Sequence, residues 1–255
     1  MVYLDLNPTN LAAEHICCAF SDKKCAAGYA AKKQWLSTQF NQGYAFRRLD
    51  ERAKVFIEYG PAETAWVPLE APNYFMLGCF WVSGKYKGQG HGKALLQSVI
   101  QAANEQGKTG LVTVVGTKKR HFMSDTKWLL RQGFEVTDEL DYGFQLIALD
   151  LKQPQSQPAF RPSVRSGQCK FKKGIAVYYT NRCPFSEFHV QQSLRETAAR
   201  RKLALHLVHL NTLSKARSAP TPATIFSLFL DGQFITTDLS VCLDARFDRI
   251  VAASQ

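Results

Sequence analysis

A loop with four glycines, set between an apolar stretch and a run with helical periodicity, constrains this chain more than any other feature of its sequence. The glycines stand at positions 84, 88, 90 and 92. Tyr74 to Val82, directly before them, is strongly apolar and predicts a strand at the centre of a sheet. Apolar side chains then recur at helical spacing at Leu95, Leu96, Val99, Ile100 and Ala103. The pattern predicts a strand, a glycine loop and an amphipathic helix in direct succession.

A loop of this kind is suited to bind a pyrophosphate. Glycine lets successive backbone N–H groups turn toward one point, and the helix that follows adds the partial positive charge of its N-terminus. The stretch lacks the GK[ST] ending of an ATP-binding P-loop, and no GxGxxG follows a first strand-to-helix turn, as a dinucleotide-binding fold requires. We therefore expect a different phosphate ligand.

The loop resembles the acetyl-coenzyme A motif of the GCN5-related N-acetyltransferases (the GNAT family), in which Arg or Gln precedes xxGxG or xxGxA. The match is the run from Lys87 to Gly92, KGQGHG, with Lys87 in place of the usual Arg or Gln. A later stretch, Trp128 to Phe134, resembles the family's FYxKxGF segment. The resemblance covers about residues 1–151. It implies a mixed α/β fold, a central sheet flanked by helices, and an acyl-coenzyme A dependent N-acyltransferase.

The same resemblance implies where acetyl-coenzyme A binds as co-substrate. The strand end would pair with the pantetheine arm, the loop amides would hold the pyrophosphate, and Ser124 would cap the later helix and touch the pantetheine. His91 could add charge against the phosphate or point into solvent. The cofactor-binding residues implied are Phe80, Trp81, Val82, Lys87, Gly88, Gln89, Gly90, His91, Gly92 and Lys93. We expect no metal, because no CxxC pair occurs and no two histidines lie one helical turn apart beside a carboxylate.

The groups that move protons are less well defined. Transfer to an amine requires a base for the amine and stabilisation of the departing thiolate. The tyrosine that commonly serves the family as acid is replaced by Leu129. Glu63 and Glu70 are candidate bases or, alternatively, solvated loop carboxylates, and Cys79 is a candidate proton donor or nucleophile or else a small core residue. The catalytic candidates are Cys79, Glu70, Ser124 and Cys183.

Other elements follow from the same periodicities. We expect helices over Leu11 to Phe20, Ala26 to Phe40 and Ser124 to Gln132, and strands over Gly43 to Arg48, Lys54 to Tyr59, Gly110 to Val115 and Phe144 to Leu151. Cys17 and Cys18 lie in the apolar part of the first helix and are expected to be buried.

A linker is predicted at residues 152–173, which are rich in Pro, Gln, Ser and Lys and have no sustained apolar period. It separates an expected first domain, residues 1–151, from a second, residues 174–255. The second reads as a strand, a helix, a strand, a hairpin marked by Asp231-Gly232, and a last helix. That order is typical of a small thioredoxin-like α/β domain.

Cys183 follows a strand and precedes a helix, where the helix dipole stabilises a thiolate. The arrangement resembles a thioredoxin-like site of the monothiol CPFS form, with Ser186 where a resolving cysteine would stand. Pro222 resembles the cis-proline that faces the thiol in that fold, and Pro220 is the alternative. A fold that now serves only as a binding or dimerising module is the other interpretation. A GNAT domain with such a tail is similar to proteins whose C-terminal region is called YoaP-like.

Charge and composition exclude few classes of protein. The net charge is +11, and its excess lies after Asp150, where 15 basic residues face 6 acidic ones. A basic surface attracts polyanions, but this charge is the sole support for a nucleic-acid partner, and a solvated basic face explains it as well. No stretch is long and apolar enough to span a membrane, and the start lacks the pattern of a secretion signal. The seven cysteines do not resemble a disulfide scaffold. A cytoplasmic protein is expected.

We predict an enzyme that transfers acetyl from acetyl-coenzyme A to an amine of a small molecule or peptide. The alternative is a thiol-handling, redox or binding protein that uses Cys183, with a first domain that senses acyl-coenzyme A. The sequence does not determine the acceptor, the oligomeric state or the coupling between the domains.

Overall fold

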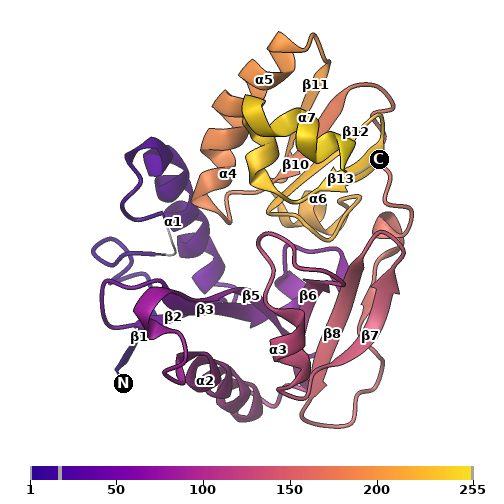
Figure 1. The fold of residues 1–255 in the computed structure, drawn as a ribbon. Coiled ribbons are helices and arrows are strands. Elements are labelled where there is room, and N and C mark those ends of the chain that lie inside the picture. Colours follow the sequence, from indigo (N-terminus) through magenta and orange to yellow (C-terminus); the bar gives the residue numbers. More distant parts are fainter. Residues whose placement is uncertain (1, 17–18, 254–255) are drawn as a thin grey trace.

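The computed structural model describes residues 2–16 and 19–253 (Figure 1). The first half of the chain builds a mixed sheet in the strand order β1-β2-β3-β5-β6-β8-β7. Its strands are β1 (Tyr3–Leu6), β2 (Ala45–Leu49), β3 (Val55–Pro61), β5 (Tyr74–Val82), β6 (Gly110–Gly116), β7 (Glu135–Leu140) and β8 (Phe144–Asp150). The fold class predicted from the sequence is confirmed for this half.

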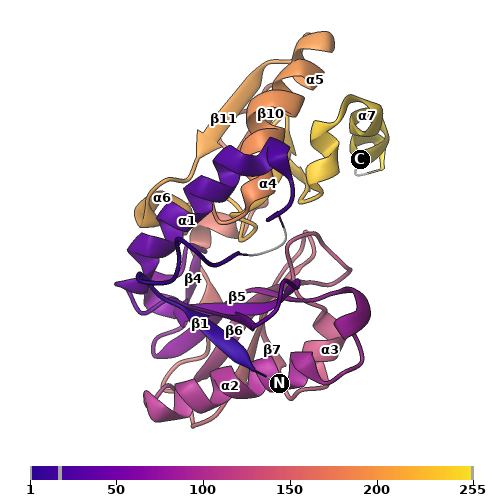
Figure 2. The ribbon, with the colours of Figure 1, turned by 90° about the vertical axis from the view of Figure 1, so that its left-hand side faces the viewer.

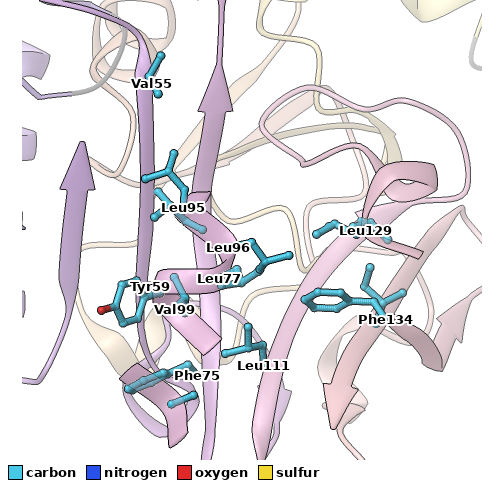
Figure 3. Close-up of a cluster of buried hydrophobic side chains, with 14 of the residues drawn as sticks. Val55, Tyr59, Phe75, Leu77, Leu95, Leu96, Val99, Leu111, Leu129 and Phe134 are labelled. Carbon is cyan, nitrogen blue, oxygen red and sulfur yellow. The ribbon is translucent and has the colours of Figure 1, made fainter. Parts of the chain in front are cut away.

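Helices cover both faces of this sheet. α2 (His91–Glu105) and α3 (Thr126–Leu130) lie on one face, and α1 (Ala26–Phe40) lies on the other, together with the second half of the chain (Figures 1 and 2). Leu95, Leu96 and Val99 of α2 pack against buried residues of β3 and β5 (Figure 3). Each fully buried side chain of this size contributes about 1.5–3 kcal/mol. The packing fixes α2, and with it the glycine loop at its start.

The central strands β5 and β6 separate along their length. They run parallel, but only Tyr74–Met76 of β5 pairs with Gly110–Val112 of β6. Beyond that point β5 keeps its pairing with β3 as far as Val82, and β6 keeps its pairing with β8 as far as Gly116. A gap therefore opens in the middle of the sheet, and backbone groups along the far part of β5 lack a sheet partner on that edge.

A bulge in β5 lies beside this gap. Phe75 and Leu77 face α2, and so do Phe80 and Val82, although strict alternation would send the second pair to the opposite face. The register shows the same irregularity, since Ile57 pairs with Phe80 while Tyr59 pairs with Leu77. One extra residue in β5 resolves both observations.

The second half of the chain has its own sheet, in the order β11-β10-β12-β13. Its elements follow the predicted order, with one short helix, α6 (Leu213–Arg217), that was not predicted between the second strand and the hairpin. They are β10 (Ile175–Tyr179), α4 (Pro184–Phe188), a π-helical turn (His189–Ser193), α5 (Leu194–Arg200), β11 (Leu205–His209), α6 (Leu213–Arg217), β12 (Phe226–Leu230), β13 (Gln233–Thr236) and α7 (Asp244–Ala252). Asp231 and Gly232 both have positive φ, 48° and 86°, as the predicted hairpin turn requires.

The two halves pack closely against each other. α1 lies beside α4, and a Cβ added to Gly28 would stand 2.1 Å from the carbonyl oxygen of Pro184. Phe234 of β13 packs against Tyr142 and Phe144 of the first half, each with a ring-centroid separation of 5.3 Å. The second half of the chain thus covers part of the sheet face on which α1 lies (Figure 2).

The predicted linker forms ordered structure. β9 (Ala159–Phe160) pairs with β4 (Leu69–Glu70), and Phe160 and Val164 are buried. The side chain of Arg165 pairs with Asp138 of β7 at 2.5 Å. This segment therefore lies along the first domain instead of spanning open solvent.

Other expectations are wrong in part. The predicted helix from Leu11 to Phe20 is absent from the described residues of that range, and Cys17 and Cys18 lie outside the described residues. Just before it, the side chain of Asn7 accepts hydrogen bonds from the backbone of Thr9 (2.9 Å) and Asn10 (3.2 Å), which stabilises a turn in place of a helix. The bonds before Pro220 and Pro222 are trans, so the expected cis-proline is not found.

Candidate active site

The glycine loop meets the start of α2 in an open, basic setting. Gly88 and Gly90 have φ of 77° and 85°, and a Cβ at either position would have no atom within 4 Å. Gly90 caps α2, and the N–H groups of the first helical turn have no partner within the helix. That turn contains no acidic residue, while Lys87 and Lys93 are exposed beside it. Backbone donors, helix dipole and lysines together suit a diphosphate.

The loop is anchored from beneath. The side chain of His91 is buried, with Nδ1 2.9 Å from the hydroxyl of Tyr3 and its ring edge-on to Tyr86. Tyr86 in turn donates a 2.5 Å hydrogen bond to Glu51. His91 therefore does not point into solvent, and its side chain holds α2 against β1. Its backbone N–H stays part of the loop.

The unpaired edge of β5 leads from the loop into the gap. Phe80, Trp81 and Val82 lie along it, and Trp81 is 48% exposed. The ring of Phe80 meets Trp128 of α3 edge to face at 5.5 Å, and a Cβ on Gly92 would stand 3.4 Å from the same tryptophan. An extended ligand with amide groups can bond to this edge as an added strand would.

Two adjoining hollows lie at the gap on the α1 face, roofed by the second domain. The first has a volume of about 40 Å³. Its walls come from residues 76–78 of β5, 113–114 of β6, the loop 121–124, Arg182 and residues 222–226. The second is lined by residues of α1 and by Tyr44, Trp66 and Arg182. Both share Met76, Gly78 and Arg182, so the bulged part of β5 is where the two meet.

A buried chain of polar groups reaches this point. Lys32 of α1 lies 2.5 Å from Oε1 of Glu58 on β3, and both side chains are almost fully buried. Tyr44 donates a 2.8 Å hydrogen bond to Oε2 of the same carboxylate. Its hydroxyl would stand 2.7 Å from a Cβ on Gly78, so only glycine leaves room for it. Burial, followed by the charge of Glu58, holds the pKa of Tyr44 well above its usual value.

Arg182 enters the same region from the second domain. Its side chain is buried, and Nη1 donates to Oγ1 of Thr224 at 3.3 Å and to the carbonyl of Trp66 at 3.5 Å. The guanidinium lies over the ring of Trp35 at 5.8 Å. A cation thus stands at the junction of the two hollows.

The catalytic candidates from the sequence are dispersed. Ser124 lines the first hollow, but Asp125 caps α3 in its place. Glu70 is exposed on β4 and pairs with Arg161 and Arg217, so it joins the two domains outside the hollows. Cys79 follows Gly78 on β5 and packs with the α1 cluster.

Leu129 is fully buried in the core, and Cys183 caps α4 outside the lining of either hollow. Glu63, the other candidate base, accepts the N–H of Asn73 at 2.6 Å. The groups that do converge on Gly78 were missed, although Glu58 stands within the apolar run VFIEY of β3, and a carboxylate at a core position is itself a signal.

Sequence comparison identifies the family of this chain. The profile described as "Acetyltransferase (GNAT) family" matches residues 9–123, and the one described as "YoaP-like" matches residues 204–249. Thus the first half of the chain has the sequence pattern of an acetyltransferase of the GNAT family. A curated protein of Bacillus subtilis, "Uncharacterized N-acetyltransferase YoaP", is 39% identical over 239 residues, 94% of either chain. The chain belongs to the GNAT acyl-coenzyme A dependent N-acyltransferases with a YoaP-like C-terminal region.

Solved structures of N-acetyltransferases resemble part of this chain more distantly. The ribosomal-protein-S18-alanine N-acetyltransferase of Escherichia coli is 17% identical with a TM-score of 0.40, over 61% of this chain and 96% of that one. The PaiA N-acetyltransferase of Thermoplasma acidophilum, solved with coenzyme A, is 16% identical with a TM-score of 0.39, over 59% and 99%. Among the described residues, no helix is long and apolar enough to cross a membrane.

Proposed function

We propose that this enzyme transfers acetyl from acetyl-coenzyme A to the amine of a small molecule. One observation carries the proposal: the open glycine loop, the unpaired edge of β5 and the hollows at Gly78 follow one another along a single strand. A diphosphate, an extended arm and a reacting group are joined in the same order in acetyl-coenzyme A. Residues 222–226 and Arg182 of the second domain help to line the first hollow, which favours a small acceptor over a protein surface.

The residues present fit this co-substrate. The amides of Gly88 to Lys93 would bind the diphosphate, with Lys87 adding charge, and the backbone of Phe80 to Val82 would bond the pantetheine arm. Acetyl-coenzyme A supplies an activated thioester: the C–N bond to the amine forms at the carbonyl carbon, the C–S bond breaks, and coenzyme A leaves as its thiolate. The protein has to orient the amine at Gly78 and receive its proton.

Tyr44 and Glu58 are the groups we assign to that proton. The hydroxyl oxygen of Tyr44 can accept a proton from an amine held at Gly78 while passing its own to Glu58. The raised pKa of Tyr44 keeps the phenol protonated, so the group acts as a relay and Glu58 as the base. Lys32 holds the carboxylate in place.

The thiol-handling alternative rests on Cys183. Cys183 is 8% exposed, and the carbonyl group of the next residue, Pro184, packs against α1. This leaves little access for a macromolecular disulfide partner. Cys183→Ser separates the two functions, because acetyl transfer should persist in that variant. Loss of all transfer with intact acetyl-coenzyme A binding would favour the thiol.

Calorimetry with acetyl-coenzyme A on the full chain, followed by mass spectrometry of an amine panel, tests the proposal. We expect saturable binding and at least one acetylated amine. The absence of acetyl-coenzyme A binding would overturn the proposed function.

A further inference from the structure

We infer that the acceptor carries a carboxylate next to its amine, as an α-amino acid does, and that Arg182 of the second domain binds this carboxylate. The inference rests on the proposed function and names its substrate class. It also gives the second domain a role in the active site.

The burial of Arg182 is the first argument. Arg182 is only 9% exposed, and none of the ion pairs formed among the described residues includes it. A buried cation without an anion is unfavourable, because the contacts with Thr224, Trp66 and Trp35 replace only part of the lost hydration. An anionic ligand would replace it.

The hydrogen bonds of Arg182 are the second argument. Nη1 makes two long contacts, both with the uncharged oxygens of Trp66 and Thr224. Nε and Nη2 have no hydrogen bond to any described residue, although the side chain lines both hollows. One edge of the planar fork is therefore available, and that edge matches the two oxygens of a carboxylate.

The local charge balance is the third argument. Lys32 and Arg182 bring two positive charges to the region, and Glu58 brings one negative charge that Lys32 already neutralises at 2.5 Å. Arg182 lies close enough to Tyr44 for its charge to oppose the rise in pKa that burial and Glu58 cause. Among the described groups around Gly78, one positive charge is thus left over for a ligand.

Position is the fourth argument. Arg182 and Gly78 line both hollows, and the hydroxyl of Tyr44 lies against Gly78. An amine at Gly78 and a carboxylate at Arg182 would then be held a short distance apart, as on adjacent atoms of an α-amino acid.

The experiment compares each of the common α-amino acids with its carboxamide as acceptor, at fixed acetyl-coenzyme A. We expect kcat/KM to be about 10- to 100-fold higher for the carboxylate form of the preferred acceptor. Arg182→Gln should lower kcat/KM for the amino acids but not for their carboxamides, which brings the ratio close to one. Arg182→Lys should restore part of the ratio.

Arg217→Gln is the matched control. Arg217 also joins the second domain to the first, by hydrogen bonds to the backbone of Glu63 and Leu69, but it does not line the hollows. Arg217→Gln should therefore leave the ratio of kcat/KM for amino acid and carboxamide unchanged. A merely structural role for Arg182 would lower both series equally, and that result overturns the inference.

Binding measured without turnover separates the two proposals. Calorimetry of the common α-amino acids and of their carboxamides in the presence of coenzyme A reports on carboxylate binding by Arg182 independently of acetyl transfer. Acetylation of uncharged amines or aminophosphates in preference to amino acids would overturn this inference and leave the proposed function standing. Carboxylate-dependent binding lost in Arg182→Gln, with no acetylated product, would support the inference and overturn the function.

Discussion

Tyr44 donates a 2.8 Å hydrogen bond to Glu58, and its hydroxyl fills the space that a side chain at position 78 would occupy. The pair therefore links the bulge of β5 to a buried carboxylate on β3. Lys32 completes the chain from α1, so three separate segments of the first domain converge on one backbone position. This convergence is the structural basis for assigning the proton to Tyr44 and Glu58.

Tyr44→Phe should lower kcat by about 100-fold or more, because general base catalysis contributes roughly 10²–10⁴-fold. The Kd of acetyl-coenzyme A should stay unchanged, since Tyr44 lies away from the glycine loop. Steady-state kinetics and calorimetry check the two expectations. Tyr59→Phe is the control, because Tyr59 is another buried tyrosine but faces α2. An unchanged kcat in Tyr44→Phe would remove the relay from the mechanism.

Gly90→Ala should weaken acetyl-coenzyme A binding at least tenfold. Gly90 has φ of 85°, where an L-residue is strained by about 1–2 kcal/mol, and the added methyl group would project into the open space in which we propose that the diphosphate binds. Titration calorimetry measures the change. Gly107→Ala is the control, since Gly107 follows the other end of α2 with φ of 67°. An equal loss of acetyl-coenzyme A affinity in both variants would indicate strain in α2, and not the loss of phosphate contacts.

The part of the site that could be predicted is local in sequence. β5 was predicted with the bounds that the structure shows, and the glycine loop and α2 follow it directly, because strand, turn and helix signals act over short distances. The same is true of the Asp231-Gly232 hairpin. The geometry of a contiguous motif is determined by its own residues.

The acceptor side could not be predicted in this way. The proposed acceptor site draws its side chains from four separate segments: Lys32, Tyr44, Glu58 and Arg182. They come close together only because α1 and the second domain pack on one face of the sheet. The sequence offers Glu70 as a candidate base or a solvated carboxylate, and in the structure its oxygens pair with Arg161 and Arg217. Strands β1 and β7 were missed for a related reason, since they are edge strands whose pairing is decided by their neighbours.

Gly28→Ala should destabilise the protein, against the usual trend. Alanine in a helix interior is favoured over glycine by about 1 kcal/mol, but here the new Cβ would lie 2.1 Å from the backbone oxygen of Pro184, which cannot rotate away. Overpacking of this kind costs about 1–3 kcal/mol. The urea midpoint should fall for Gly28→Ala and stay level or rise slightly for Ser37→Ala at an exposed position of α1. A higher midpoint for Gly28→Ala would show that α1 and α4 are not tightly packed there.

Asp138 should make the contact between β7 and residues 159–165 sensitive to acid. Burial raises the pKa of Asp138, but hydrogen bonds from Arg165 and from the N–H of Phe160 more than offset it and hold the pKa below its usual value. A carboxylate with a lowered folded-state pKa stabilises the fold above about pH 4 and loses that effect as the pH falls further. The urea midpoint of the wild type should therefore exceed that of Asp138→Asn at pH 7, and the difference should shrink below about pH 4. Asp5→Asn, which breaks an exposed pair with Arg47, should show a smaller difference at neutral pH. A difference for Asp138→Asn that stays constant down to pH 3 would contradict the assigned charge.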